Sequence, residues 1–292
     1  MTPRTVEKYI EPLEAPFEEI AARLISGDVP EQFIEVLKDY PRSPLRYPGG
    51  KSRAVKSIYA VIPKEEKTLC SPFLGGASLE LACTTRMEVY GSDIFQPLVT
   101  FWDVLLKEPE KLITSVEKYY PLSSKKFYNL QKIYRTLTDE VELAAAFFVL
   151  NRASFSGTTA SGGMSPGHPR FTHSAIERLR KFSVSNFHVE CADYQDVIPK
   201  HENDFLYLDP PYMNGQALYG DRGSTHKGFD HKALAELLGK RDRWIMSYND
   251  CEEIRNLYPK NNILTVDWIY GMAKNKQSNE VLILSNDLAL AA

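Results

Sequence analysis

The sequence lacks the features that mark membrane-spanning, secreted or metal-bound proteins. Its 292 residues include only four cysteines, with no C-x-x-C pair and no histidine at zinc-ligand spacing. The longest apolar run, Leu143–Leu150, is far shorter than the roughly 20 residues that span a bilayer. The N-terminus has no apolar core of the kind that a signal peptide needs. We therefore expect a reduced, cytoplasmic protein with no membrane contact and no bound metal.

A strong charge of one sign is also missing. The formal net charge of -3 argues against a uniformly basic protein that coats nucleic acid. The charges are unevenly spread, however, because residues 1–42 carry nine acids and five bases. We interpret residues 1–42 as an acidic, helical N-terminal extension. Residues 121–200 carry ten bases and seven acids, which indicates either a patch that faces nucleic acid or an ordinary solvated surface.

From residue 45 onward, helical and strand patterns alternate. Apolar runs predict strands at 68–70, 89–93, 187–191, 205–208, 244–248, 263–268 and 281–284. Helical periodicity predicts helices at 52–62, 79–84, 173–182 and 230–238, and a largely helical segment over 97–150. This order favours a parallel sheet with helices on both faces. The Gly-, Ser- and Thr-rich segment 151–171 is too long for a simple connection, which is typical of a functional or disordered loop.

The segment Asp209-Pro-Pro-Tyr212 directly follows a strand that is apolar throughout, Phe205–Leu208. In open α/β sheets, ligands bind beyond the carboxyl ends of the strands. Two successive prolines remove two N–H donors and leave backbone carbonyls free to accept, and Asp209 adds a carboxylate beside them. These acceptors suit the exocyclic amino group of a planar ligand, whose ring can stack on Tyr212. The alternative is a simple turn with Tyr212 in the core.

Two more segments indicate a nucleotide-like cofactor. Pro72-Phe-Leu-Gly-Gly-Ala-Ser78 joins a strand to a helix, where glycines and free N–H groups admit a ligand close to the backbone. Asp93 ends the next strand, 20 residues after Phe73, at the spacing of an acid that binds ribose hydroxyls. In Arg46-Tyr-Pro-Gly-Gly-Lys51, the lysine can reach a carboxylate and the tyrosine can cover a sulfonium group. Each segment alone is also compatible with a plain tight turn.

In their order along the chain, from Arg46–Lys51 to Asp209–Tyr212, these segments resemble the Dam-type DNA adenine-N6 methyltransferases, the D12 class with alpha-group motif order. That family has a W-A-G-G-K-like segment, a P-F-x-G-x-G-S turn, an acid at the end of the next strand, a target-recognition insert and D-P-P-Y. The resemblance implies an α/β class I S-adenosylmethionine-dependent methyltransferase fold, with a mostly parallel seven-stranded sheet whose last strand is antiparallel. It also implies S-adenosylmethionine as methyl donor and double-stranded DNA as substrate.

The resemblance assigns roles by position. Cofactor contacts are implied for Tyr47, Lys51, Phe73, Gly75, Asp93, Asp193 and Asp209. The transfer itself is assigned to Asp209, Pro210 and Tyr212, with the target adenine flipped out of the duplex. DNA contacts are predicted for Arg152, Phe155, Arg170 and Lys274. The catalytic domain is expected at 43–100 and 185–292, and the helical target-recognition insert at 101–184.

The sequence departs from the family pattern at three places. Ala77 replaces the second glycine of the turn, Tyr47 replaces the usual tryptophan, and Phe155-Ser-Gly157 stands where the family has F-N-G. Two other kinds of function stay open from the sequence: the same fold acting on another amine, such as RNA adenine, cytosine N4 or protein glutamine, and a catalytically silent DNA-binding module. A cognate restriction endonuclease is a candidate partner, and the expected state is a monomer or weak dimer.

Overall fold

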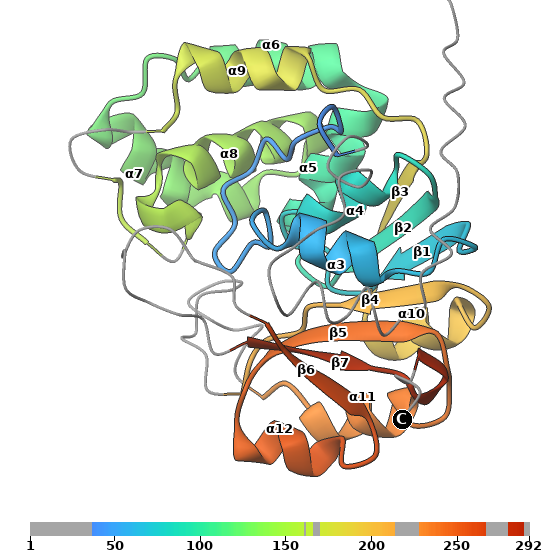
Figure 1. The fold of residues 1–292 in the computed structure, drawn as a ribbon. Coiled ribbons are helices and arrows are strands. Elements are labelled where there is room, and N and C mark those ends of the chain that lie inside the picture. The colour runs from blue at the N-terminus through green and yellow to red at the C-terminus, as the bar shows by residue number, and fades with distance from the viewer. Residues whose placement is uncertain (1–36, 161, 166–169, 214–227, 267–279, 289–292) are drawn as a thin grey trace, which may run out of the picture.

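The chain forms one seven-stranded sheet. The computed structural model describes residues 37–160, 162–165, 170–213, 228–266 and 280–288. The strands lie in the order β3-β2-β1-β4-β5-β7-β6 (Figure 1). Their bounds are β1 Thr68–Ser71, β2 Glu88–Asp93, β3 Phe187–Cys191, β4 Phe205–Leu208, β5 Trp244–Asn249, β6 Asn262–Val266 and β7 Glu280–Leu284. Strands β1 to β5 pair in parallel, whereas β7 is antiparallel to both β5 and β6. The predicted fold class is confirmed.

The central strands are covered on both faces, as their continuous apolar runs predict. Successive side chains of a strand point to opposite faces. In β4, Phe205 and Tyr207 belong to one apolar cluster, while Leu206 and Leu208 belong to the cluster on the other face. All four side chains are buried. The turn that follows β4 therefore starts from a rigid support.

Three helices cover each face of the sheet. One face carries α3 Val55–Val61, α4 Ser78–Cys83 and α5 Gln96–Lys107. The other face carries α10 Tyr194–Lys200, α11 His231–Leu238 and α12 Glu252–Leu257. The sequence patterns did not indicate α10 or α12, because a helix of two turns or fewer offers too few repeats of its apolar face.

The predicted helical segment over 97–150 consists of several helices that meet on α8. These are α5, α6 Pro109–Glu117, α7 Ser124–Ile133 with the short turn η1 Tyr134–Thr136, and α8 Glu140–Ala153. Helix α9 His173–Arg180 lies beside α6 (Figure 1). From Ala144 onward, every residue of α8 is buried, as expected for a helix that is apolar all round. These helices share one apolar cluster with the sheet, and the division into domains at 101–184 stays a prediction.

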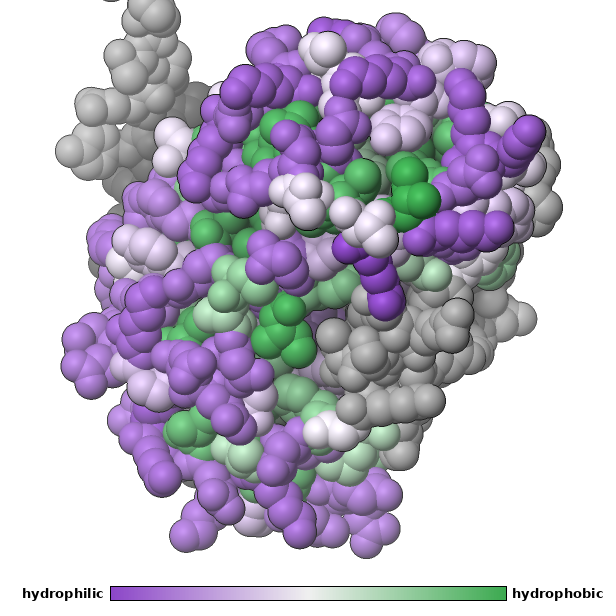
Figure 2. Space-filling model, turned by 180° about the vertical axis from the view of Figure 1, so that it is seen from behind, coloured by the Kyte–Doolittle hydropathy of each residue, from purple (hydrophilic) through white to green (hydrophobic). Residues whose placement is uncertain are grey.

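The surface and the N-terminal region add two observations. Hydrophilic side chains cover most of the face shown in Figure 2, with smaller apolar groups between them. Most of the predicted extension 1–42 lies outside the described residues, but Leu37 and Tyr40 are buried against the core of the sheet. Among the described helices, none combines the length and the apolar character needed to cross a bilayer.

The contact between Phe101 of α5 and Phe148 of α8 ties the sheet side to the helical insert. Their rings are stacked at 5.7 Å with an angle of 7°, and both side chains are fully buried. We expect Phe148→Ala to lower the free energy of unfolding by about 3–5 kcal/mol, because the truncated ring leaves a cavity. Urea denaturation measures this loss. Phe155→Ala, at a side chain that is 58% exposed, is the control with little effect. Equal midpoints for both variants would refute this account of the packing.

Candidate active site

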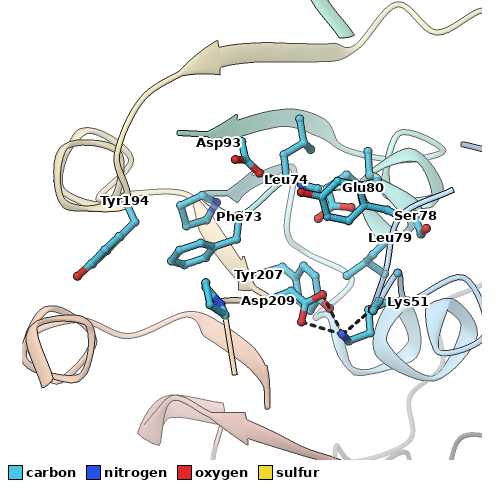
Figure 3. A pocket seen from close by; sticks show the side chains of 18 of the residues that line it. Lys51, Phe73, Leu74, Ser78, Leu79, Glu80, Asp93, Tyr194, Tyr207 and Asp209 are labelled. Carbon is cyan, nitrogen blue, oxygen red and sulfur yellow. Dashed lines mark hydrogen bonds and ion pairs between the residues drawn. The ribbon is translucent and has the colours of Figure 1, made fainter. Parts of the chain in front are cut away.

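A pocket of about 860 Å³, partly open to solvent, lies beyond the carboxyl ends of β1, β2 and β4. It brings together all seven residues predicted to contact the cofactor: Tyr47, Lys51, Phe73, Gly75, Asp93, Asp193 and Asp209. In Figure 3, Lys51 and Asp209 point toward one another, and Asp93 lies toward the other end of the pocket.

The turn between β1 and α4 forms one wall of the pocket. Gly75 has a φ of +46°, and Ala77 has a φ of 53° although it carries a Cβ. A Cβ added to Gly76 would lie 2.8 Å from the Cβ of Tyr47. A side chain at position 76 would therefore collide with Tyr47. Trp102 of α5 donates from Nε1 to the Gly75 carbonyl at 3.2 Å. The turn is therefore held from both sides, and Ala77 occupies a conformation that favours glycine.

Asp93 links this turn to the end of β2. Its Oδ2 accepts from the Gly75 N–H at 3.1 Å, and its Oδ1 accepts from the Phe95 N–H at 3.0 Å. Burial raises the pKa of the Asp93 carboxyl, while these N–H donors act in the opposite direction. Each carboxylate oxygen can accept a second hydrogen bond. Asp93 can thus hold the turn and still bind a hydroxyl in the pocket.

Asp209 receives donors from three parts of the chain. Lys51 Nζ lies 2.8 Å from both Oδ1 and Oδ2, and it also donates to the Gly49 carbonyl at 3.1 Å. Ser247 of β5 donates from Oγ to Oδ1 at 2.9 Å, and Tyr212 donates from Oη at 3.3 Å. The Lys51 side chain is 4% exposed and that of Asp209 is 23% exposed. This ion pair closes one end of the pocket.

Ser247 and Tyr207 fix the Asp209 carboxylate from beneath. Both side chains are buried, and their hydroxyl oxygens lie 3.1 Å apart. Because the single hydroxyl proton of Ser247 points to Asp209, Tyr207 is the donor in the Tyr207–Ser247 bond. Burial raises the pKa of Tyr207, so it stays a neutral donor. No local pattern indicates either residue, since each contributes through a contact between different strands.

The rest of the Asp209–Tyr212 turn packs on β5. Tyr248 donates from Oη to the Pro211 carbonyl at 3.2 Å, and the Tyr212 and Tyr248 rings lie 5.1 Å apart. Pro210 is buried. Lys51 Nζ lies 5.1 Å from the centre of the Tyr212 ring. Tyr212 is half-buried beside the pocket, with its ring held at an angle of 30° to that of Tyr248.

Asp193 and three aromatic residues form the pocket wall nearest α10. Asp193 is the N-cap of α10 and accepts from the Gln195 N–H at 2.9 Å. Phe73 lies 5.5 Å from Tyr194 and 5.6 Å from Phe229 between ring centres. The cap fixes the direction of the Asp193 side chain, and the aromatic group offers an apolar surface to a flat ligand.

The residues predicted to contact DNA are placed differently from one another. Phe155 is 58% exposed, and Arg170 is also exposed. Arg152 is buried and donates to the carbonyls of Pro44 and Arg170, at 3.3 Å and 3.2–3.3 Å. Burial lowers the pKa of Arg152, and the charges of other guanidinium groups nearby add to this. Lys274 lies outside the described residues. The DNA contacts of all four remain predictions.

The loop that carries Phe155 has an unusual backbone. Ser156 has a φ of 54° and Gly157 a φ of 78°. Asparagine adopts this left-handed region more readily than serine does. The family's asparagine in F-N-G therefore suits the conformation at position 156 better than the serine of this chain does.

Glu80 is a buried acid in the pocket wall that the sequence analysis did not identify. It is 3% exposed, and its Oε1 accepts from Ser71 Oγ at 2.7 Å. Burial raises the pKa of Glu80 to about 7, and the charge of Asp209 acts in the same direction. Neutral pH is therefore close to the pH at which the Glu80 carboxyl loses its proton. Among the described residues, no cluster of His, Cys, Asp and Glu is arranged to hold a metal ion.

Comparisons with known proteins agree with this geometry. The model of the D12 class N6 adenine-specific DNA methyltransferase family matches residues 47–272. A DNA N-6-adenine-methyltransferase of Escherichia phage P1 is 26% identical over 255 residues, which cover 80% of this chain and 33% of the relative. The modification methylase StsI of Streptococcus sanguinis is 24% identical over 290 residues, 86% of this chain and 44% of the relative. This chain thus spans less than half of either relative's length.

A third relative is closer to this chain in length. The Type II methyltransferase M1.LlaDCHI of Lactococcus lactis subsp. cremoris is 23% identical over 208 residues. The match covers 66% of this chain and 73% of that relative.

The raised pKa of Glu80 predicts a pH-dependent stability. The folded protein binds this proton more tightly than the unfolded chain does, so the stabilisation is fully present below pH 4.5 and is lost as the pH rises through about 7. We expect Glu80→Gln to match the wild type near pH 4.5 and to exceed it at pH 8 by on the order of 3 kcal/mol. Urea denaturation at both pH values measures this, with the exposed Glu236→Gln as control. A constant difference between wild type and Glu80→Gln would contradict the assignment.

Proposed function

The chain belongs to the D12 class N6 adenine-specific DNA methyltransferase family, and we propose that it transfers a methyl group from S-adenosylmethionine to N6 of adenine in duplex DNA. The observation that carries the proposal is the Asp209 carboxylate, held at the mouth of a pocket by Lys51 and Ser247. The carboxylate is followed by Pro210 and the half-buried Tyr212. An amine acceptor and an aromatic surface thus adjoin the pocket that holds the predicted cofactor contacts.

The residues of the pocket fit S-adenosylmethionine. The Gly75–Gly76 turn leaves no room for a Cβ beneath Tyr47, and Asp93 retains acceptor capacity for ribose hydroxyls. Phe73 and Tyr194 supply apolar surface for the adenine moiety, with Asp193 at its edge. Lys51 would hold the carboxylate of the methionine moiety. When bound, S-adenosylmethionine supplies an electrophilic methyl group.

Asp209 makes the target nitrogen a better nucleophile. The lone pair of adenine N6 is delocalised into the ring, so the amine is weakly reactive. Hydrogen bonds from its two hydrogens to Asp209 and to the Pro210 carbonyl draw the nitrogen toward tetrahedral geometry and localise the pair. Lys51 contacts both oxygens of Asp209, so an amine that donates to Asp209 has to share one of these oxygens with it or displace it. Ser247 keeps the carboxylate oriented during this exchange, so positioning supplies much of the rate.

The target base has to leave the duplex to reach Asp209. Tyr212 offers a stacking surface at the turn, and the exposed Phe155 can fill the space that the base leaves in the helix. Arg46, Arg152, Arg170 and Arg178 lie close enough for their charges to act on one another. Their combined positive potential attracts the phosphate backbone.

The main alternative is methylation of another amine by the same fold. An aspartate at the first position of the Asp209–Tyr212 segment favours adenine over cytosine and glutamine, for which the resembling families have Ser or Asn. The helical insert, with its cluster of arginines, favours DNA over a small substrate. The relative StsI is named a modification methylase, which supports a place in a restriction-modification system with a cognate endonuclease as partner.

The decisive substitution is Asp209→Ala. We expect methyl transfer to DNA to fall by at least about 1000-fold, because the nitrogen is no longer activated. Binding of the cofactor should change by no more than about tenfold, since Asp93 and the glycine turn remain. Tritium transfer from labelled S-adenosylmethionine to DNA, RNA and protein measures methyl transfer. Calorimetry measures the binding of the cofactor. Mass spectrometry of digested DNA identifies the methylated base.

Glu236→Ala, at an exposed side chain of α11, is the matched control for the Asp209 variant. It should retain the wild-type rate of transfer. An Asp209→Ala variant that methylates DNA normally would overturn the proposed chemistry. A wild-type protein that labels only RNA or protein would overturn the proposed substrate.

Phe155→Ala tests base flipping. We expect affinity for a DNA duplex to fall by about tenfold, because an aromatic contact with the base stack is lost. The fluorescence of 2-aminopurine at the target adenine should rise on binding to the wild type and much less with the variant. Cofactor affinity in the absence of DNA should be unchanged. An unaltered fluorescence response would show that Phe155 takes no part in flipping.

A further inference from the structure

Asn151 is a buried polar residue in the last turn of α8, directly before the buried Arg152. Its side chain is 0% exposed. Oδ1 accepts from the Arg46 N–H at 2.9 Å, and Nδ2 donates to the carbonyls of Arg46 at 2.8 Å and of Gly157 at 3.1 Å. The carboxamide thus pairs with both backbone groups of one residue, as a neighbouring strand would. Because every group is satisfied, this arrangement specifies one geometry.

On one side, Asn151 holds the segment that forms the pocket. Arg46 is the residue directly before Tyr47, whose ring covers the Gly75–Gly76 turn. The same short segment ends at Lys51, which binds Asp209 at 2.8 Å. A shift of Arg46 is therefore passed through the backbone to the proposed cofactor site and to the carboxylate.

On the other side, Asn151 holds the loop that presents Phe155. A Cβ added to Gly157 would lie 2.0 Å from the Arg46 carbonyl oxygen, so loop and segment are in direct contact. Arg46 also donates from Nη1 to the Ser154 carbonyl at 3.3 Å. Gln131 of α7 supports the far side of the loop, where it donates to the Gly162 carbonyl at 2.8 Å. Gln131 is therefore a matched comparison, because it holds the loop without touching Arg46.

We propose that Asn151 is a positioning residue that couples DNA binding to the cofactor pocket. The inference rests on the proposed function, since it assumes that Phe155 meets DNA and that Tyr47 and Lys51 meet the cofactor. DNA that presses on the loop moves or steadies Arg46 through the carboxamide, and with it the Lys51–Asp209 pair. Coupling of two binding sites is reciprocal. Each ligand therefore strengthens the binding of the other through Asn151.

The experiment compares Asn151→Ala with Gln131→Ala. Hydrogen–deuterium exchange of the free protein should quicken at residues 45–51 and 154–159 in Asn151→Ala. In Gln131→Ala, it should quicken only in the loop. Calorimetry with the unreactive analogue sinefungin, with and without unmethylated plasmid DNA, measures the coupling. DNA should tighten sinefungin binding to the wild type and to Gln131→Ala, but not to Asn151→Ala.

The steady-state rates give a second readout. We expect kcat to fall by about 100-fold in Asn151→Ala, since a small misplacement near the reacting groups has such an effect. Gln131→Ala should raise the KM for DNA and leave kcat near that of the wild type. The proposal is overturned if the two variants share one phenotype, or if Asn151→Ala keeps both the coupling and kcat.

A substitute variant and a test of the wild-type activity complete the experiment. Should Asn151→Ala fail to fold by circular dichroism, Asn151→Ser retains a small donor and acceptor at the same place and is measured instead. A wild-type protein that does not methylate DNA refutes the proposed function. In that case, exchange at 45–51 still decides whether Asn151 holds this segment, and unchanged exchange there would refute its positioning role as well.

Discussion

The contact between Lys51 and Asp209 is the interaction on which the proposed site depends. It joins two residues that lie 158 positions apart in the sequence. Through two distances of 2.8 Å, it holds the segment Arg46–Lys51 at the end of β4. Without it, the carboxylate would lose its principal cation. Removing one partner of such a little-exposed pair is costly, because the other charge is left without compensation. The pair therefore stabilises the arrangement of the site.

Much of the sheet and pocket could be predicted from the sequence, because the signals are local. The apolar run Phe205–Leu208 predicted a strand covered on both faces, and the spacing from Phe73 to Asp93 placed an acid at the same edge. The contacts of Ser247, Glu80 and Asn151 were not predicted. Each depends on which distant strand or loop comes to lie beside it, and a short-range pattern carries no such information. Arg152 shows the same limit, since no short-range pattern indicates that its side chain is buried against the carbonyls of Pro44 and Arg170.

The helical insert is not an independent attachment. From Ala144 onward, helix α8 is buried on all sides and shares its apolar cluster with the sheet. Its last turn holds Asn151, beside both the Phe155 loop and the pocket segment. A helical region built in this way cannot tilt freely against the sheet. Its precision comes from the core, whereas the exposed side chains at its rim can vary in sequence without disturbing the pocket.

The antiparallel β7 has a consequence for synthesis of the chain. Strand β6 precedes β7 in the sequence, yet β7 is its only neighbour in the described sheet. During synthesis, β6 stays unpaired until β7 (residues 280–284) has left the ribosome and inserted between β6 and β5. An apolar strand with an open edge is prone to associate with other chains. Stalling of synthesis between these two strands would therefore favour aggregation of the nascent chain.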